Sequence, residues 1–186
     1  GCGRRVMDPI GWLEDNERYF SREMNGYDRA PVGPYLSTLP LIDRDGKMMD
    51  MGSGNGMLLK FLMTFSNHSL VPFGVDINEK AIEQAKKEVL PEFGENFEIG
   101  DVVNYHFPEG KYDVILANPF YAKPDMGGFT DRCLDNLNPG GRLLFRIHDD
   151  VLRYNEVERL DEMPGFKDKG MSVSEGYGLS FCVFDR

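Results

Sequence analysis

Cysteine is scarce in this sequence: its 186 residues include three, Cys2, Cys133 and Cys182. Their number is odd, they lie far apart and they form no C-x-x-C pair, which argues against a disulfide framework and against a zinc site. No apolar run approaches the length of about 18 residues that a membrane-spanning helix needs, and no signal peptide is recognisable. We therefore expect a cytoplasmic protein with no membrane partner.

Positive charge is also in short supply, with 21 Lys and Arg against 31 Asp and Glu and a net charge of −10. Because no block of basic residues stands out, the sequence argues against a broad surface for nucleic acid, although a local basic groove remains open. The three histidines, His68, His106 and His148, are scattered and lack metal-ligand spacing, so no metal is predicted.

The residues that are present suit a folded globular protein, since 41% are apolar and 12% are aromatic. The length fits one domain, which we divide into an N-terminal helical or lid segment, residues 1–40, and a main part, residues 41–186. The chain begins Gly-Cys-Gly without Met, so we expect either residues added in cloning or a piece of a longer protein. The oligomeric state is not indicated.

Short apolar runs alternate with amphipathic stretches along the chain. The runs predict strands at residues 47–51, 71–77, 96–99, 112–117 and 142–147, and a closing strand pair at 171–173 and 179–184. The periodicity predicts helices at 57–65, 79–89, 129–137 and 151–163, preceded by a helix at 9–24 and a connector at 30–34. The alternation of strand and helix predicts an open, mostly parallel α/β sheet.

The stretch M-M-D-M-G-S-G-N-G-M-L-L, residues 48–59, places Gly52, Gly54 and Gly56 between the first strand and its helix. In such sheets, ligands bind outside the carboxyl ends of the strands. The spacing G-x-G-x-G is one residue shorter than the dinucleotide fingerprint, and no G-K-[ST] follows, which excludes a P-loop. A glycine-rich structural turn is the alternative interpretation.

Two further carboxylates end the next two strands. Asp76 lies 20 residues after Gly56 and could accept hydrogen bonds from both hydroxyls of a ribose. The alternative is that Asp76 or Asn78 caps the following helix, and both roles can coexist. Asp101 could accept from an exocyclic amine, or it could be a turn residue at the end of the strand.

At these residues the sequence resembles the class I S-adenosylmethionine-dependent methyltransferases. D-M-G-S-G-N-G matches their D-x-G-x-G-x-G motif, and the later motifs are resembled by V-P-F-G-V-D-I-N, F-E-I-G-D-V, Y-D-V-I-L-A-N-P-F and L-N-P-G-G-R-L-L-F. The resemblance covers about residues 47–186. It implies a seven-stranded sheet with helices on both faces and an antiparallel last strand.

The resemblance also implies S-adenosylmethionine as the cofactor and assigns contacts with it to Asp50, Gly52, Ser53, Gly54, Gly56, Asp76, Ile77, Asp101, Val102 and Asn118. The glycines would let the backbone approach the methionine and ribose portions, and Asp50 would help to hold the ammonium end. Asp76 would take the ribose hydroxyls. Ile77 would line the adenine. Asp101 would accept a hydrogen bond from the adenine amine, and the Val102 backbone N–H would face a ring nitrogen.

The tetrad Asn118-Pro119-Phe120-Tyr121 follows the fourth strand and resembles the [N/D]-P-P-[Y/F] motif of amino methyltransferases at three of four positions. The resemblance implies that the Asn118 side chain and the Pro119 carbonyl accept from a target NH2 group, on which Tyr121 stacks. Phe120 replaces the second proline, which removes a backbone restraint. The alternative is a turn at Asn-Pro with Phe120 in the core.

The sequence thus predicts a methyltransferase that methylates an amino or amide nitrogen of an unidentified acceptor, which could be a protein amide, a small molecule or a nucleic-acid base. The alternatives are O- or C-methylation of a small molecule, a noncatalytic cofactor-binding module and a nicotinamide-dependent oxidoreductase. His148 could act as a base but is expected in a surface loop. The N-terminal aromatics could form a lid, although we expect Trp12 and Phe20 to cover the sheet.

Overall fold

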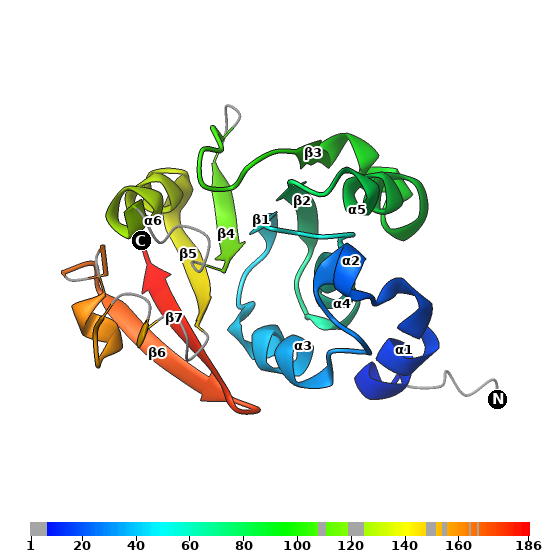
Figure 1. The fold of residues 1–186 in the computed structure, drawn as a ribbon, viewed down its shortest axis with the longest axis horizontal. Helices are drawn as coiled ribbons and strands as arrows, with labels where there is room; N and C mark the ends of the chain where they lie inside the picture. The colour runs from blue at the N-terminus through cyan, green and yellow to red at the C-terminus, as the bar shows by residue number, and fades with distance from the viewer. Residues whose placement is uncertain are drawn as a thin grey trace.

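The computed structural model describes residues 7–107, 111–118, 125–147, 152–153, 156–163, 165–166 and 168–186. Seven strands within these ranges form one sheet in the order β3-β2-β1-β4-β5-β7-β6 (Figure 1). Their bounds are β1 (Gly46–Met51), β2 (Leu70–Asp76), β3 (Phe97–Ile99), β4 (Tyr112–Ala117), β5 (Leu137–Ile147), β6 (Met171–Gly176) and β7 (Leu179–Asp185). Strands β1 to β5 pair in parallel and β7 runs antiparallel to both neighbours. The predicted sheet with its antiparallel last strand is confirmed.

The helices of the main part follow the strands in turn. They are α4 (Met57–Phe65), α5 (Glu79–Gln84) with its π-helical continuation η3 (Ala85–Val89), η4 (Pro91–Asn96), α6 (Met126–Asp135) and η6 (Leu160–Glu162). Ahead of the sheet lie α1 (Pro9–Asp15), η1 (Glu17–Tyr19), α2 (Arg22–Asn25), α3 (Val32–Thr38) and η2 (Leu39–Leu41).

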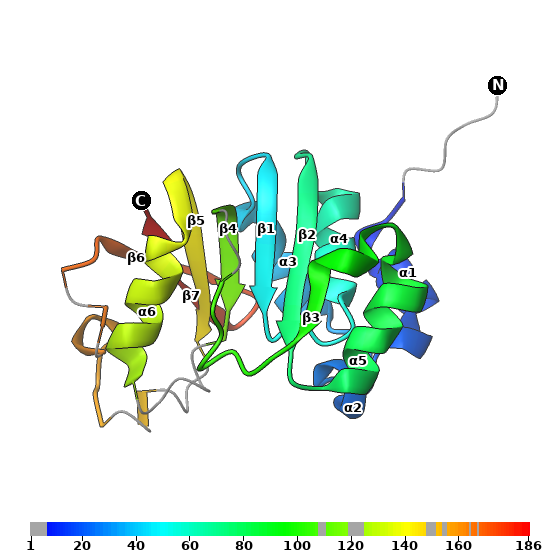
Figure 2. The ribbon, with the colours of Figure 1, turned by 90° about the horizontal axis from the view of Figure 1, so that it is seen from above.

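The side chains of the central strands point alternately into two apolar cores, one on each face of the sheet. Met48 and Leu116 pack into the core that α1, α3, α4 and α5 cover. Met49 and Ile115 point the other way, into the core that α6 covers. In Figure 2, α6 lies in front of the sheet and α3 and α4 lie behind it. Both faces of the central strands are therefore buried, which explains their nearly continuous apolar sequences.

The N-terminal segment is not the single helix predicted for residues 9–24. Asn16 ends α1 by donating its side-chain Nδ2 to the Trp12 carbonyl at 2.8 Å, and Ser21 begins α2 by accepting from the Met24 N–H at 3.2 Å. Phe20 lies between them in extended conformation and buries its ring against Tyr35. The helix is broken because side-chain caps compete with its continuation on both sides of a buried aromatic residue.

The predicted connector at residues 30–34 is also wrong in part, because α3 begins at Val32. Trp12 packs against Phe61 and Phe65, with ring centroids 5.9 and 5.8 Å apart. Trp12 and Phe20 are thus core residues, as expected, and the segment shares its core with the sheet.

Two predictions near the C-terminus also need correction. The strand predicted for residues 142–147 begins earlier, at Leu137, and in its first part Asn138 donates its side-chain amide to Asp113 at 3.0 Å. The described part of residues 151–163 is not one helix: only 152–153 and η6 are helical, and Glu156 has a φ of 55°. A left-handed residue at that point ends any regular helix.

We predict that Phe61→Ala destabilises the protein by about 3–5 kcal/mol, because Phe61 is fully buried at the centre of the aromatic cluster and truncation leaves a cavity. Urea unfolding followed by circular dichroism measures the effect. Val71→Ala, at a much more exposed position on β2, serves as the control. A loss below about 1 kcal/mol for Phe61→Ala would contradict this packing.

Candidate functional site

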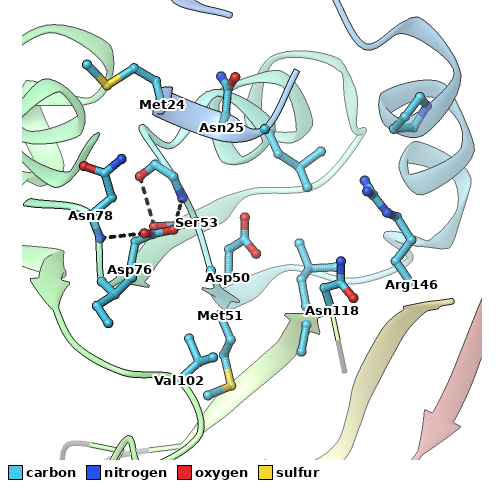
Figure 3. Close-up of a pocket in the computed structure, with 18 of the residues that line it drawn as sticks. Met24, Asn25, Asp50, Met51, Ser53, Asp76, Asn78, Val102, Asn118 and Arg146 are labelled. Atoms are coloured by element: carbon cyan, nitrogen blue, oxygen red, sulfur yellow. Dashed lines mark hydrogen bonds between the residues drawn. The ribbon is translucent and has the colours of Figure 1, made fainter. Parts of the chain in front are cut away.

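A cavity of about 670 Å³ opens at the carboxyl ends of β1, β2 and β4 (Figure 3). Its size is typical of small-molecule sites. Nine of the predicted site residues line it: Asp50, Gly52, Ser53, Gly54, Asp76, Ile77, Asp101, Val102 and Asn118. The prediction that strand ends bring these residues together is therefore supported by their position.

The glycine loop closes one side of the cavity. The N–H groups of Gly52 and Ser53 both donate to the Val75 carbonyl, at 2.8 and 3.0 Å, which fixes the loop against the end of β2. Gly52 has a φ of +85° and no atom within 4 Å of the position that a Cβ would take, so its side faces open space. A ligand can therefore lie directly on the backbone at Gly52.

The other two glycines of the loop have different neighbours. A Cβ on Gly54 would lie 2.5 Å from the Met24 carbonyl oxygen, because α2 packs directly on the loop. A Cβ on Gly56 would lie 3.2 Å from the Phe97 ring. Gly56 is not part of the cavity wall, so the structure does not bring it to the predicted cofactor contact, and it serves packing instead.

Asp76 reaches across from the end of β2 and accepts from the Gly54 N–H and the Asn78 N–H, both at 2.8 Å. Asn78, not Asp76, caps α5, because its side chain accepts from the Ala81 N–H at 3.2 Å. Each carboxylate oxygen retains a second lone pair, so Asp76 can still accept a hydrogen bond from a ligand in the cavity.

The residues expected at an adenine line the outer part of the cavity. Asp101 is exposed and accepts from the Val103 N–H at 3.0 Å and from the Asn104 side chain at 3.1 Å, which makes it a turn residue as well as a wall residue. Ile77 is 74% exposed and Val102 is half-buried beside it. An exposed isoleucine at a cavity mouth offers a flat apolar surface to a planar ligand.

Asp50 lies deeper in the cavity, between Asp76 and Asn118 (Figure 3). It is 7% exposed, and this burial raises the pKa of its carboxyl to about 7, with the charge of Asp76 adding to the rise and that of Arg146 opposing it. A carboxyl of this pKa is a strong partner for a cation, because a nearby positive charge favours its ionised form.

The N-terminal segment, which sequence reasoning treated only as a possible lid, supplies the wall opposite the strands. Asn25 donates its side-chain amide to the Asn55 side chain at 3.1 Å, and Asn55 donates to the Tyr19 carbonyl at 2.7 Å and to the Gln84 side chain at 2.8 Å. Asn55 is fully buried in the glycine loop. This amide network attaches the segment to the loop and to α5. The position of Asn55 within the glycine loop was the sequence signal that could have pointed to this role.

A second attachment holds the same segment at the mouth of the cavity. The Asn78 side chain donates to the Glu23 carbonyl, and Lys80 pairs with the Glu23 carboxylate at 2.8 Å. Residues 22–27 therefore lie as a fixed strap along the cavity, and Met24 and Asn25 are labelled above it in Figure 3.

Arg146 of β5 is another wall residue that sequence reasoning missed. It follows Phe145 in the strand R-L-L-F-R-I, and a charged residue between two apolar residues of a strand was the signal that could have pointed to it. Its guanidinium donates to the Tyr27 hydroxyl.

The predicted catalytic residues are described only in part. Asn118 lies in the cavity wall at the end of β4, whereas Pro119 and Tyr121 fall outside the described residues, as do Phe120 and His148. His106 is not in the described wall. His68 lies at the opposite edge of the sheet, where it contacts Asp45 at 3.1 Å.

Within the described ranges, no three His, Cys, Asp or Glu side chains gather into a group that could hold a metal ion. In the same part of the chain, every helix is too short or too polar to cross a lipid bilayer.

Comparisons with known proteins identify methyltransferases as similar to this chain. A family model described as "Methyltransferase domain" matches residues 42–174. A trans-aconitate 2-methyltransferase from Sinorhizobium fredii is 30% identical over 122 residues, which are 65% of this chain and 45% of that protein. The match thus spans less than half the length of that relative.

Among solved structures, a methyltransferase from Pyrococcus furiosus superposes with a TM-score of 0.61 at 17% identity, covering 95% of each chain. A SAM-dependent methyltransferase from Thiobacillus denitrificans in complex with S-adenosyl-L-homocysteine has a TM-score of 0.55 at 18% identity, covering 91% of this chain and 73% of that one. At these identities the likeness shows the fold.

We predict that Asp50→Asn stabilises the protein at pH 8, by about 1–4 kcal/mol, and that the gain shrinks as the pH falls towards 4. Since the folded-state pKa of Asp50 lies above the unfolded value of 3.8, the native state binds more protons in this window, and wild-type stability falls as the pH rises through it. Urea unfolding at pH 5, 6, 7 and 8 measures the difference. A gain that is the same at every pH would contradict the raised pKa.

Proposed function

The chain belongs to the class I S-adenosylmethionine-dependent methyltransferases, and on that premise we propose that it transfers a methyl group to an amino or amide nitrogen of its acceptor. The observation that carries the proposal is the cavity at the strand ends, where Asn118 shares a wall with the glycine loop and three carboxylates. The family cofactor, S-adenosylmethionine, supplies an electrophilic methyl group on a sulfonium.

The residues of the cavity fit that cofactor. Gly52 leaves open space where a side chain would stand, and Asp50 and Asp76 offer negative charge beside it. We assign Asp76 to the ribose hydroxyls, Asp50 to the ammonium group, and Ile77, Val102 and Asp101 to the adenine. These assignments are the ones that the resemblance to the family implies.

Asn118 is the residue that we assign to the acceptor. It lies at the end of β4 beside Asp50, and its side-chain oxygen can accept a hydrogen bond from a target NH2 group (Figure 3). Such a bond would orient the nitrogen lone pair for an in-line displacement, and orientation is the main task in this chemistry. The strap at residues 22–27 would keep water from the reacting atoms.

O-methylation of a small carboxylic acid is the second candidate. One relative is named for trans-aconitate, a small polycarboxylate. Arg146 in the cavity wall favours an anionic acceptor. The net charge of −10 disfavours a long polyanion but not a molecule of this size.

We predict that the wild-type protein binds S-adenosylhomocysteine with micromolar affinity in calorimetry and that NADH gives no heat. Asp76→Ala should weaken the binding by about 1–3 kcal/mol, because buried hydroxyl groups lose a charged acceptor. Asp161→Ala, an exposed carboxylate paired with Arg159, is the matched control. Since Asp76 also braces Gly54, thermal unfolding must show that the variant is folded. Binding of NADH in place of S-adenosylhomocysteine would end the methyltransferase assignment.

We predict that Asn118→Ala lowers the rate of methyl transfer by about 10²-fold, as for the loss of one oriented hydrogen bond to reacting atoms. The assay uses S-adenosylmethionine with a labelled methyl group and acceptor fractions of a cell extract. Unchanged turnover on an acceptor identified in this way would refute the role of Asn118 in N-methylation.

A further inference from the structure

Charge is unevenly distributed along the cavity. In Figure 3, Asp76, Asp50, Asn118 and Arg146 follow one another across the view. The carboxylates thus lie at the end of the glycine loop, and a guanidinium lies at the far end, past Asn118. Arg22, the other cation in the described wall, is 80% exposed at its side chain and is held by Asp28 at 2.6 Å.

The strand register places Arg146 on the cavity side of the sheet. On β5, Leu144 and Arg146 share one face, and Phe145 and Ile147 are buried in the core on the other. Arg146 pairs with Phe181 of β7, which also lines the cavity. The guanidinium therefore cannot turn to the opposite core without losing the packing of the strand.

Tyr27 of the N-terminal strap orients this guanidinium. Arg146 donates through Nη1 to the Tyr27 hydroxyl, and its Cζ lies 5.8 Å from the centre of the Tyr27 ring. Tyr35 packs edge-on against Tyr27, with centroids 6.2 Å apart. The planar group thus contacts both the hydroxyl and the ring of Tyr27, in the way that proteins prepare an arginine for a planar anion.

The walls around Arg146 are mainly apolar, formed by Leu116, Leu144, Phe181 and the buried ring of Tyr35. In such surroundings a charge acts over a longer distance than in water. Asp50 is the carboxyl on which Arg146 acts, and burial raises the pKa of that carboxyl to about 7 despite the guanidinium.

We propose that Arg146, oriented by Tyr27, anchors a carboxylate group of the methyl acceptor, so that the acceptor is a small carboxylic acid. The inference rests on the proposed function and adds a substrate class to it. A carboxylate suits the site better than a phosphate, because one guanidinium balances one negative charge and four carboxylates already line the same cavity. The carboxylate is an anchor, and no bond to it forms or breaks when the methyl group moves.

The first arm of the test separates the acceptor from the cofactor, whose amino-acid end also carries a carboxylate. Calorimetry with S-adenosylhomocysteine should give the same Kd, within about twofold, for wild type, Arg146→Met and the control Arg159→Met, an exposed arginine paired with Asp161. A Kd raised tenfold or more in Arg146→Met alone would assign the guanidinium to the cofactor and overturn the proposal.

The second arm uses succinate, glutarate and benzoate as probes, each compared with its amide, on the protein saturated with S-adenosylhomocysteine. We expect at least one acid to bind at least fivefold more tightly than its amide. Arg146→Met should remove about 10- to 100-fold of the acid's affinity, Arg146→Lys should restore part of it and Arg159→Met should change nothing. Absence of any preference for the acids in wild type would overturn the proposal.

The third arm follows labelled methyl groups into an extract fractionated by anion exchange. The labelled product should come from the retained, acidic fraction, and Arg146→Met should lower its kcat/KM at least tenfold. Labelling confined to unretained fractions would refute the inference. If S-adenosylhomocysteine binds while the acids do not, the substrate class alone fails; if S-adenosylhomocysteine does not bind, the proposed function fails with it.

Discussion

The carboxylate of Asp76 holds together the two loops on which the cavity depends. One oxygen accepts the Gly54 N–H from the loop after β1, and the other accepts the Asn78 N–H from the loop after β2. Parallel pairing of β1 with β2 brings these loops to the same edge of the sheet, and the carboxylate then fixes their separation. The strap at residues 22–27 packs on these two loops, since Asn78 donates to the Glu23 carbonyl and Gly54 lies against Met24. A single half-buried acceptor thus sets the geometry of three chain segments.

Much of the sheet was predictable because its strands carry their own signals. α4 has the predicted bounds, since an amphipathic repeat follows directly on a glycine, and β4 was recognised from a nearly continuous apolar run. The N-terminal helices were not predictable, because each is short and some of their contacts are with residues far away in the sequence. Asn25, for example, is held by Asn55, which is 30 residues away in the chain. Patterns within a window of the sequence cannot encode such contacts.

The candidate site divides in the same way. The residues that belong to strand ends, such as Asp50, Asp76 and Asn118, were found because topology alone brings strand ends together. Gly56 belongs to the same G-x-G-x-G pattern as Gly52 and Gly54, but the absence of its Cβ makes room for the Phe97 ring. Arg146 and Tyr27 were missed because their contact joins residues 119 positions apart and depends on how the N-terminal segment crosses the sheet. The far end of the cavity is therefore known only from the folded chain.

The burial of Asp50 has a consequence for what happens when the cavity fills. With a pKa of about 7, this carboxyl carries a proton in about half of the molecules at neutral pH. Any cation that settles beside it stabilises the ionised form and expels that proton. The cavity then exchanges the proton of Asp50 for the positive charge of the ligand. At low pH, protons therefore compete with a cationic ligand for the same carboxylate oxygens.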